Sequence, residues 1–332
     1  MKTDNNQIKK ECSGEPGMRH VCRPPADISI SQLYGGKWHQ ARSAREGLEI
    51  PFALDTAGRP VQLHIGFSWE AHGFLTGSVG SGKSSLLHTL LLSAMMCYPP
   101  SELEIWYAAG EWDELEPVLQ GKQVQVLHME ADSAGGASVN LWDRILEEMD
   151  RRRKLFVMGR TRNFESYRER EALPRILVVI DDFWRVYQLY REMEDTCQLE
   201  TIISEANFCG ISILFCSRCI DRWMPDRILA RIPVRVAMRN HEDKIKESLA
   251  VEYQETSGDL QKKILEINRS AKGVAIYGYW RQKADNSFEW EKVYCFCRAA
   301  YADPEDMERI LAKIQKGHPD FMQQSYSSIK RD

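Results

Sequence analysis

The chain of 332 residues lacks any run of about eighteen consecutive apolar residues, the length that a membrane-spanning helix requires. Its first residues, MKTDNNQIKKECSGEPGMRH, are polar and lack the apolar core of a secretory signal. We therefore expect a cytoplasmic protein with no direct membrane span.

An excess of positive charge is also missing. The 44 Lys and Arg residues stand against 48 Asp and Glu, a formal net charge of -4, so the chain lacks the overall basic signature of nucleic-acid binding. Any DNA contact would have to be local. A hydrophobic content of 43% and a charged content of 28% are typical of a soluble globular protein. The length suits one large α/β domain with appendages.

The nine cysteines form no recognisable framework, because their number is odd and they are scattered along the chain. Cys216 and Cys219 make one CxxC pair, but no second pair or nearby histidine completes a zinc site. Reduced thiols that pack in the core are the favoured interpretation.

Short apolar runs alternate with helical segments from about residue 46, which predicts a mostly parallel central sheet flanked by helices. The predicted strands are 61–67, 73–76, 103–108, 124–128, 176–180, 211–215, 234–238, 274–279 and 293–297. The predicted helices are 83–96, 141–158, 164–171, 184–191, 197–207, 242–251 and 307–314.

Three regions follow from this pattern. Residues 1–45 contain several prolines and no sustained periodicity, so we expect a flexible N-terminal arm. Residues 46–300 form the predicted catalytic domain. Residues 301–332 hold one amphipathic helix and a polar end, which we expect to be a disordered tail.

A phosphate-binding loop is the strongest motif, since residues 77–85 read GSVGSGKSS between an apolar strand and a helix. Small residues leave backbone N–H groups free to converge on phosphate oxygens. Lys83 would reach the outer phosphates, and the Ser84 hydroxyl would ligate Mg²⁺. The alternative is a surface glycine turn with an incidental lysine. We predict ATP binding by Gly77, Ser78, Val79, Gly80, Ser81, Gly82, Lys83, Ser84 and Ser85.

Two carboxylates follow the later apolar strand in the segment RILVVIDDFW. We assign Asp181 to the magnesium side, acting through bound water. Asp182 stands where many such ATPases carry a glutamate that orients or deprotonates the attacking water, so we predict a catalytic role for Asp182 together with Lys83. The alternative is an ordinary strand end with two solvated acids.

Several segments together resemble the FtsK/SpoIIIE branch of RecA-like motor ATPases, which includes the type VII secretion ATPases. They stand in the family's order across residues 46–300 and include LEIPFALDTAGRPVQLHIG, HGFLTGSVGSGKSSLLHTLLLSA, PPSELEIWYAAGEWDELE, LPRILVVIDDFW, EANFCGISILFCSR and RIPVRVAMRNHEDKIKESLA. The resemblance implies a RecA-like fold, ATP with Mg²⁺, a homo-oligomer with a hexameric ring as one form, and DNA as the cargo. It also implies a membrane-anchored or nuclease partner subunit.

The sequence departs from the family at two points. Arg218 replaces the usual glutamine that senses the γ-phosphate, and Lys246 falls near a position where a serine-arginine pair is common. Arg231, Arg235 and Arg239 are candidate arginine fingers or members of a charged face. With the shorter side chain of Asp182, these changes favour slow turnover.

Three functions therefore remain open: a DNA-translocating motor, which leads, a secretion ATPase that acts on protein, and a weakly hydrolysing scaffold. The basic run at residues 151–154, with Arg160 and Arg162, either contacts DNA phosphates or pairs with the acids on its own helix. The second interpretation is favoured, because Glu147 and Glu148 precede the run on the same helix.

Overall fold

The computed structural model describes residues 24–25, 28–34, 42–109, 118, 123–128, 141–184, 196–220, 224, 226–250, 257–270, 272–282 and 290–315.

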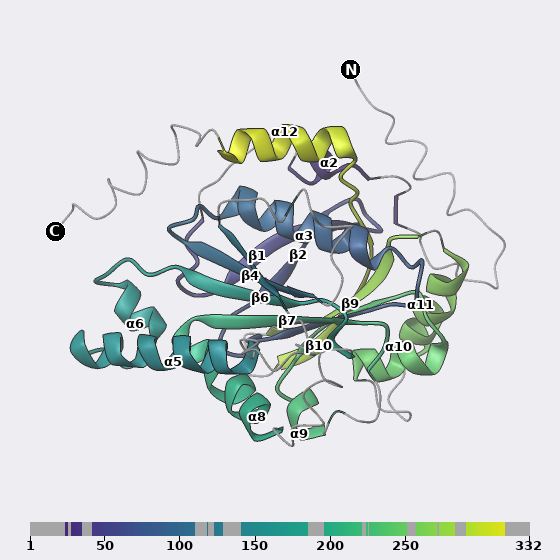
Figure 1. The fold of residues 1–332 in the computed structure, drawn as a ribbon. Coiled ribbons are helices and arrows are strands. Elements are labelled where there is room, and N and C mark those ends of the chain that lie inside the picture. The colour runs from purple at the N-terminus through teal and green to yellow at the C-terminus, as the bar shows by residue number, and fades with distance from the viewer. Residues whose placement is uncertain are drawn as a thin grey trace, which may run out of the picture.

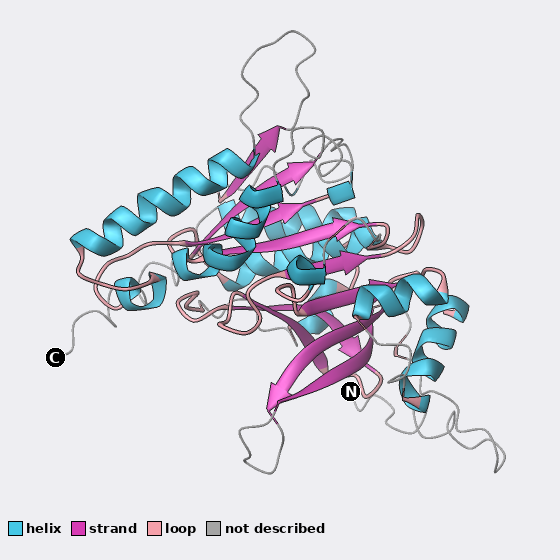
Figure 2. Cartoon of the chain, turned by 90° about the horizontal axis from the view of Figure 1, so that it is seen from below, coloured by secondary structure: helices cyan, strands magenta, loops and turns pink. Residues whose placement is uncertain are grey.

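One ten-stranded sheet organises the described chain, in the order β2-β1-β10-β9-β8-β3-β7-β6-β4-β5. The strands from β8 to β5 are parallel, while β9, β10, β1 and β2 extend the sheet in antiparallel fashion. Figure 2 shows the long antiparallel strands curling away from the parallel part. The bounds are β1 Leu48–Asp55, β2 Pro60–Ile65, β3 Gly73–Thr76, β4 Leu103–Ala109, β5 Val124–His128, β6 Arg175–Ile180, β7 Ile211–Ser217, β8 Val234–Met238, β9 Val274–Gln282 and β10 Trp290–Ala299.

The predicted α/β class and all nine predicted strands are confirmed, but β1 was not predicted. Its sequence contains Pro51, which argues against a strand inside a sheet. The structure accommodates the proline at a register shift between Pro51 and Ala53, and β1 pairs with β10 only from Ala53 to Asp55. The missing N–H of Pro51 therefore falls outside the ladder with β10.

Helices cover both faces of the sheet (Figure 1). One face carries α3, with α2 and α12 outside it, and the opposite face carries α5, α6, α8 and α9. The bounds are α2 Ile30–Leu33, α3 Lys83–Cys97, α5 Leu141–Met158, α6 Phe164–Arg168, α8 Thr196–Glu205, η1 Ala206–Cys209, α9 Asp226–Leu229, α10 Glu242–Leu249, α11 Gly258–Arg269 and α12 Pro304–Gln315. The predicted helix 184–191 lies largely outside the described residues.

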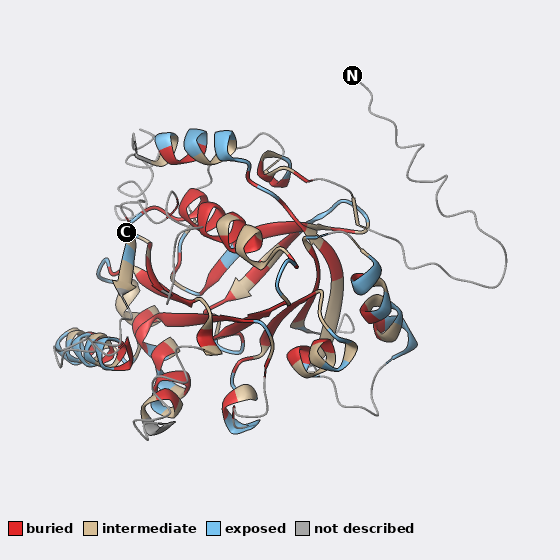
Figure 3. Cartoon of the chain, turned by 45° about the vertical axis from the view of Figure 1, so that its right-hand side comes forward, coloured by how far each residue is buried: buried red, intermediate tan, exposed pale blue. Residues whose placement is uncertain are grey.

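Helix α11 was missed although its signal is present in the sequence. Leu260, Ile264 and Ile267 recur at helical spacing and are buried, and the Ser257 side chain accepts a hydrogen bond from the N–H of Leu260. Helix α3, in contrast, is apolar around nearly its whole circumference, because it lies between the sheet and α12 (Figure 3).

Residues 28–34 differ from the flexible arm that the sequence predicted for 1–45. The Tyr301 N–H donates to the Ile28 carbonyl at 2.7 Å, and the Ile30 N–H donates to the Tyr301 carbonyl at 3.0 Å. Ile28, Ile30 and Leu33 are buried in the same core as α3. Apolar burial therefore fixes this segment, which we call the N-terminal strap.

The basic run at residues 151–154 is largely engaged within the fold, as the self-paired interpretation proposed. Arg151 and Arg152 each form an ion pair with Glu148 at 2.7 Å. Arg152 is buried rather than solvated, and it also donates to the carbonyls of Cys209 and Pro174. Arg152 therefore stabilises the fold and is not available to DNA, whereas Arg151 is paired with Glu148 at the surface.

A buried acid between β2 and β3 makes stability depend on pH. The Glu70 side chain is 2% exposed and accepts a hydrogen bond from the Trp280 N–H at 3.3 Å. Burial raises the pKa of Glu70 from 4.5 to about 7. The folded state thus binds more protons than the unfolded state in that window, and this stabilising contribution is lost as the pH rises through it.

We expect Glu70→Gln to remove this slope. Relative to the wild type, the variant should gain about 2 kcal/mol of unfolding free energy between about pH 5 and pH 8. Urea unfolding at both pH values measures the change, with the exposed Glu171→Gln as the matched control. A gain of the same size in the control would show that burial of Glu70 is not the cause.

Candidate nucleotide-binding site

The phosphate loop joins β3 to α3 and requires glycine at specific positions. Gly80 and Gly82 have φ angles of 73° and 101°, which side chains rarely adopt. A Cβ on Gly77 would lie 2.5 Å from the Ser81 Oγ, and one on Gly82 would lie 3.0 Å from the Gly273 nitrogen. The backbone of the loop can therefore approach its neighbours only without these side chains.

Three neighbouring strands hold the loop in place. The Gly77 N–H donates to the Ser217 carbonyl at the end of β7 at 3.3 Å. Ser78 donates to the Arg239 carbonyl, just after β8, through both its N–H at 3.0 Å and its hydroxyl at 2.8 Å. The Gly273 N–H, just before β9, donates to the Ser81 carbonyl at 2.9 Å. The sequence motif did not reveal these anchors, because they come from strands more than a hundred residues away.

Lys83 and Asp181, predicted from separate motifs, come together at one edge of the sheet. The Lys83 Nζ lies 3.9 Å from the Asp181 Oδ1, and their side chains are 19% and 17% exposed. The Tyr107 hydroxyl donates to the Asp181 Oδ2 at 3.1 Å, and the Asp182 N–H donates to the Oδ1 at 2.9 Å. Both carboxylate oxygens of Asp181 are thus oriented. Tyr107, on β4, is a positioning residue that sequence analysis missed.

Asp182, the second residue after β6, has a left-handed backbone with a φ of 51°. Asp and Asn tolerate this region better than most residues, and such conformations concentrate at functional sites. Asp182 is partly exposed beside the half-buried Asp181. The sequence could not predict this turn.

The loop and the carboxylates fit a nucleotide with magnesium. The glycine cradle leaves room for phosphate oxygens, and the buried Ser81 Oγ has no hydrogen-bond partner among the described residues. Ser84 and Ser85 are half-buried in the first turn of α3, where the positive end of the helix dipole favours an anion. No described group of three His, Cys, Asp or Glu side chains could hold a metal alone. Magnesium would therefore depend on phosphate oxygens and water as well as on Ser84 and Asp181.

The three candidate arginine fingers have different surroundings. Arg235 is buried and donates to the Leu229 carbonyl at 2.5 Å, so it cannot reach another subunit. Arg239 donates to the Gly80 carbonyl at 2.9 Å within its own loop. Arg231 is exposed before β8. Arg218, at the sensor position after β7, is also exposed, and its carbonyl accepts a hydrogen bond from Asn240.

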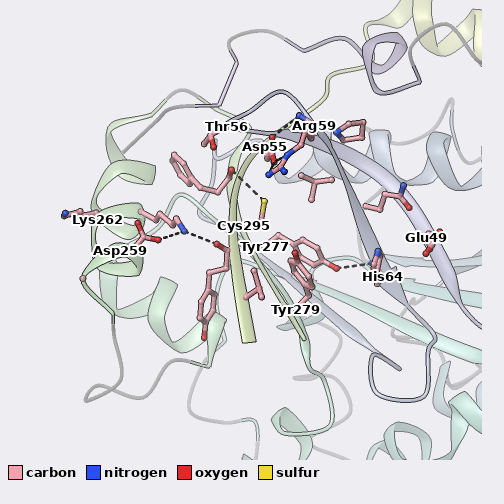
Figure 4. A pocket seen from close by; sticks show the side chains of 18 residues that line it. Glu49, Asp55, Thr56, Arg59, His64, Asp259, Lys262, Tyr277, Tyr279 and Cys295 are labelled. Carbon is pink, nitrogen blue, oxygen red and sulfur yellow. Dashed lines mark hydrogen bonds and ion pairs between the residues drawn. The ribbon is translucent and has the colours of Figure 1, made fainter. Parts of the chain in front are cut away.

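A large cavity, of about 1180 Å³, lies away from these residues. Figure 4 shows its walls, which come from β1, β2, β9, β10 and α11 and include none of the phosphate loop. Its charged side chains are partly paired, with Arg59 2.7 Å from Asp55 and Lys263 2.6 Å from Asp259. Its size alone does not make it the nucleotide site.

A parallel sheet with a glycine loop after one strand and a carboxylate after another defines a P-loop fold of the RecA-like type. The FtsK/SpoIIIE family model matches residues 33–241, more than half of the chain. The chain therefore belongs to the FtsK/SpoIIIE family, and the resemblance read from the sequence is confirmed.

Curated relatives include both DNA translocases and secretion proteins. The DNA translocase SftA of Bacillus subtilis is 27% identical over 206 residues, which cover 59% of this chain and 21% of the relative. The ESX secretion system protein EccC of Thermomonospora curvata is 24% identical over 214 residues, 60% of this chain and 16% of the relative. The chain thus spans about a fifth of the length of the relatives it matches.

Solved structures share the fold. The cytoplasmic domain of the type VII secretion ATPase EccC from Thermomonospora curvata matches with a TM-score of 0.67 and 19% identity, over 89% of this chain and 35% of that one. The conjugation coupling protein TcpA of pCW3, solved with ATPγS, matches with a TM-score of 0.58 and 19% identity, over 91% and 80%. Within the described residues, no helix has the length and apolar character needed to cross a bilayer.

Proposed function

We propose that this chain binds and hydrolyses Mg-ATP in the cytoplasm as one subunit of a ring that moves DNA. The carrying observation is the convergence of the glycine loop, Lys83 and the oriented Asp181 at one edge of the sheet, with Lys83 and Asp181 3.9 Å apart. The cation and the carboxylate are the two groups that phosphoryl transfer needs beside the phosphates and the metal.

Each residue has a defined part in this proposal. Loop N–H groups and the α3 dipole bind the phosphates, and Lys83 neutralises charge that develops on the transferred group. Ser84 and Asp181 would hold Mg²⁺, which would supply positive charge that stabilises the negative charge of the phosphates. Asp182 orients the attacking water and accepts its proton. Tyr107 keeps Asp181 in place through its hydrogen bond.

In the ring, a neighbouring subunit would supply the arginine that the single chain does not place at its own site. Among the three arginines considered, only Arg231 is neither buried nor bound to its own loop. We therefore assign Arg231 as the candidate that a neighbouring subunit presents to the γ-phosphate. A membrane-anchored or nuclease partner would direct such a homo-oligomer.

DNA as the cargo rests on the relatives, which include the translocases SftA and FtsK. We expect linear duplex DNA to increase phosphate release several-fold, with binding that weakens steeply as salt rises. Phosphate release with and without DNA, and filter binding at two salt concentrations, test this expectation. If DNA neither binds at low salt nor stimulates phosphate release, DNA is excluded as the cargo. The secretion ATPase then becomes the stronger candidate.

A weakly hydrolysing ATP-binding scaffold is a further candidate. It is favoured by the short Asp182 side chain and by the exposed Arg218 at the sensor position. Tight nucleotide binding with turnover that neither DNA nor protein accelerates would support this candidate over the motor.

A further inference from the structure

The strand order shows on which side of the loop the nucleoside must lie. Asp181 follows β6, which lies beyond β7 on one side of β3, so the γ-phosphate end of the nucleotide faces that side. On the other side of β3 lie β8, β9 and β10. The nucleoside at the opposite end of the triphosphate must therefore extend toward these strands.

A cavity of about 470 Å³ lies on that side, directly beside the loop. This volume is within the usual range of about 300–1,000 Å³ for small-ligand pockets. Gly82 and Ser85 form one wall, and the start of β9, the end of β10 and the N-terminal strap form the others. The lining residues are Ile28, Ser29, Gly82, Ser85, Lys272, Gly273, Arg298, Ala299, Ala300, Tyr301 and Asp303.

The cavity is fixed to the loop and to α3 by backbone contacts. The Gly273 N–H donates to the Ser81 carbonyl at 2.9 Å, and the Ala299 N–H donates to the Gly273 carbonyl at 2.8 Å. The Thr89 hydroxyl of α3 donates to the Ala300 carbonyl at 2.6 Å. The walls of the cavity therefore keep a set position relative to the phosphates.

Tyr301 combines a fixed backbone with an accessible ring. Its N–H and carbonyl both bond to the N-terminal strap, at 2.7 and 3.0 Å, while the residue is 53% exposed at the cavity. An aromatic face held in this way is a stacking surface for a base. Lys272 and Arg298 add two cationic side chains to the cavity, which suits the negative charge at the α-phosphate.

We propose that this cavity holds the ribose and base of the nucleotide, with the base stacked on Tyr301. The inference rests on the proposed nucleotide binding and deepens it. It gives a binding role to the N-terminal strap and to the end of β10, which lie largely outside the family-matched residues 33–241. Binding of the nucleoside would thus depend on parts of the chain that the family motifs do not contain.

The test compares ligands with and without a nucleoside. We expect Tyr301→Ala to weaken ATPγS binding about tenfold in calorimetric titration and to leave inorganic tripolyphosphate affinity unchanged. Tyr301→Phe, which keeps the ring, should bind ATPγS like the wild type. Phe208→Ala is the matched control, because Phe208 is 65% exposed and does not line this cavity.

The outcomes distinguish failure of the nucleoside cavity from failure of the proposed nucleotide binding. Wild-type affinity for ATPγS in Tyr301→Ala, beside a wild type that binds both ligands, would overturn the nucleoside cavity and leave the phosphate site standing. Equal losses for ATPγS and tripolyphosphate in a Tyr301→Ala variant that is folded would also overturn it, because they would show that Tyr301 acts on the phosphate site and not on the nucleoside. A wild type that binds neither ligand would overturn the proposed function and this inference together.

Discussion

Lys83→Ala is expected to lower ATP hydrolysis by at least about a hundredfold, the usual cost of removing a group that stabilises transition-state charge. The Lys83 Nζ is placed by the first turn of α3 and lies 3.9 Å from the Asp181 Oδ1. Arg239 is not expected to replace it, because its guanidinium is bound to the Gly80 carbonyl. Steady-state phosphate release, with and without DNA, measures the loss.

The variant should remain folded. Asp181 keeps its hydrogen bonds from Tyr107 and from the Asp182 N–H, so the carboxylate is not left without partners. Lys154→Ala, at an exposed position on α5, is the matched control and should hydrolyse ATP like the wild type. Equal rates in Lys83→Ala and the wild type would show that the measured hydrolysis does not come from this site.

Asp182→Asn is expected to lower turnover by about a hundredfold while ATP affinity stays near that of the wild type. The amide keeps the size of the side chain and tolerates the left-handed φ of 51°, so the change removes the base with little strain. Single-turnover hydrolysis and ATPγS titration separate the two effects.

Asp182→Glu tests the length of the side chain. The added methylene would move the carboxylate by about 1 Å, a distance that can change a rate about a hundredfold, whereas the left-handed backbone costs Glu only about 1–2 kcal/mol. We therefore expect faster turnover than in the wild type. Full activity in Asp182→Asn would show that Asp182 is not the base, whatever the Glu variant does.

Much of the fold could be predicted because its signals are local. The phosphate loop is a contiguous run, and the strand before Asp181 is a continuous apolar segment, so both follow from short stretches of sequence. The strand β1 and the N-terminal strap were missed for a different reason. Pro51 is tolerated only because of a register shift, and Ile28 is ordered only because Tyr301 lies beside it.

The residues of the candidate site also fall into two groups, those that local motifs predict and those that only the structure reveals. Lys83 and Asp181 could be named from motifs, but Tyr107 reaches Asp181 only because β4 and β6 pair with Tyr107 opposite Val179. The contact of Gly273 with the loop depends on the placement of β9. Register and strand order are long-range properties, and a single sequence without a structure does not reveal them.

The pairing of the N-terminal strap with Tyr301 also bears on how the domain should be delimited. A shortened chain that began at residue 46 would leave the Tyr301 N–H and carbonyl without their partners at Ile28 and Ile30, and would uncover apolar side chains of the core around α3. The family-matched region alone, residues 33–241, would lack Tyr301 as well as Ile28 and Ile30, together with the strands β9 and β10. We therefore expect that a shortened chain must keep both residues 28–34 and Tyr301 if this part of the core is to stay covered.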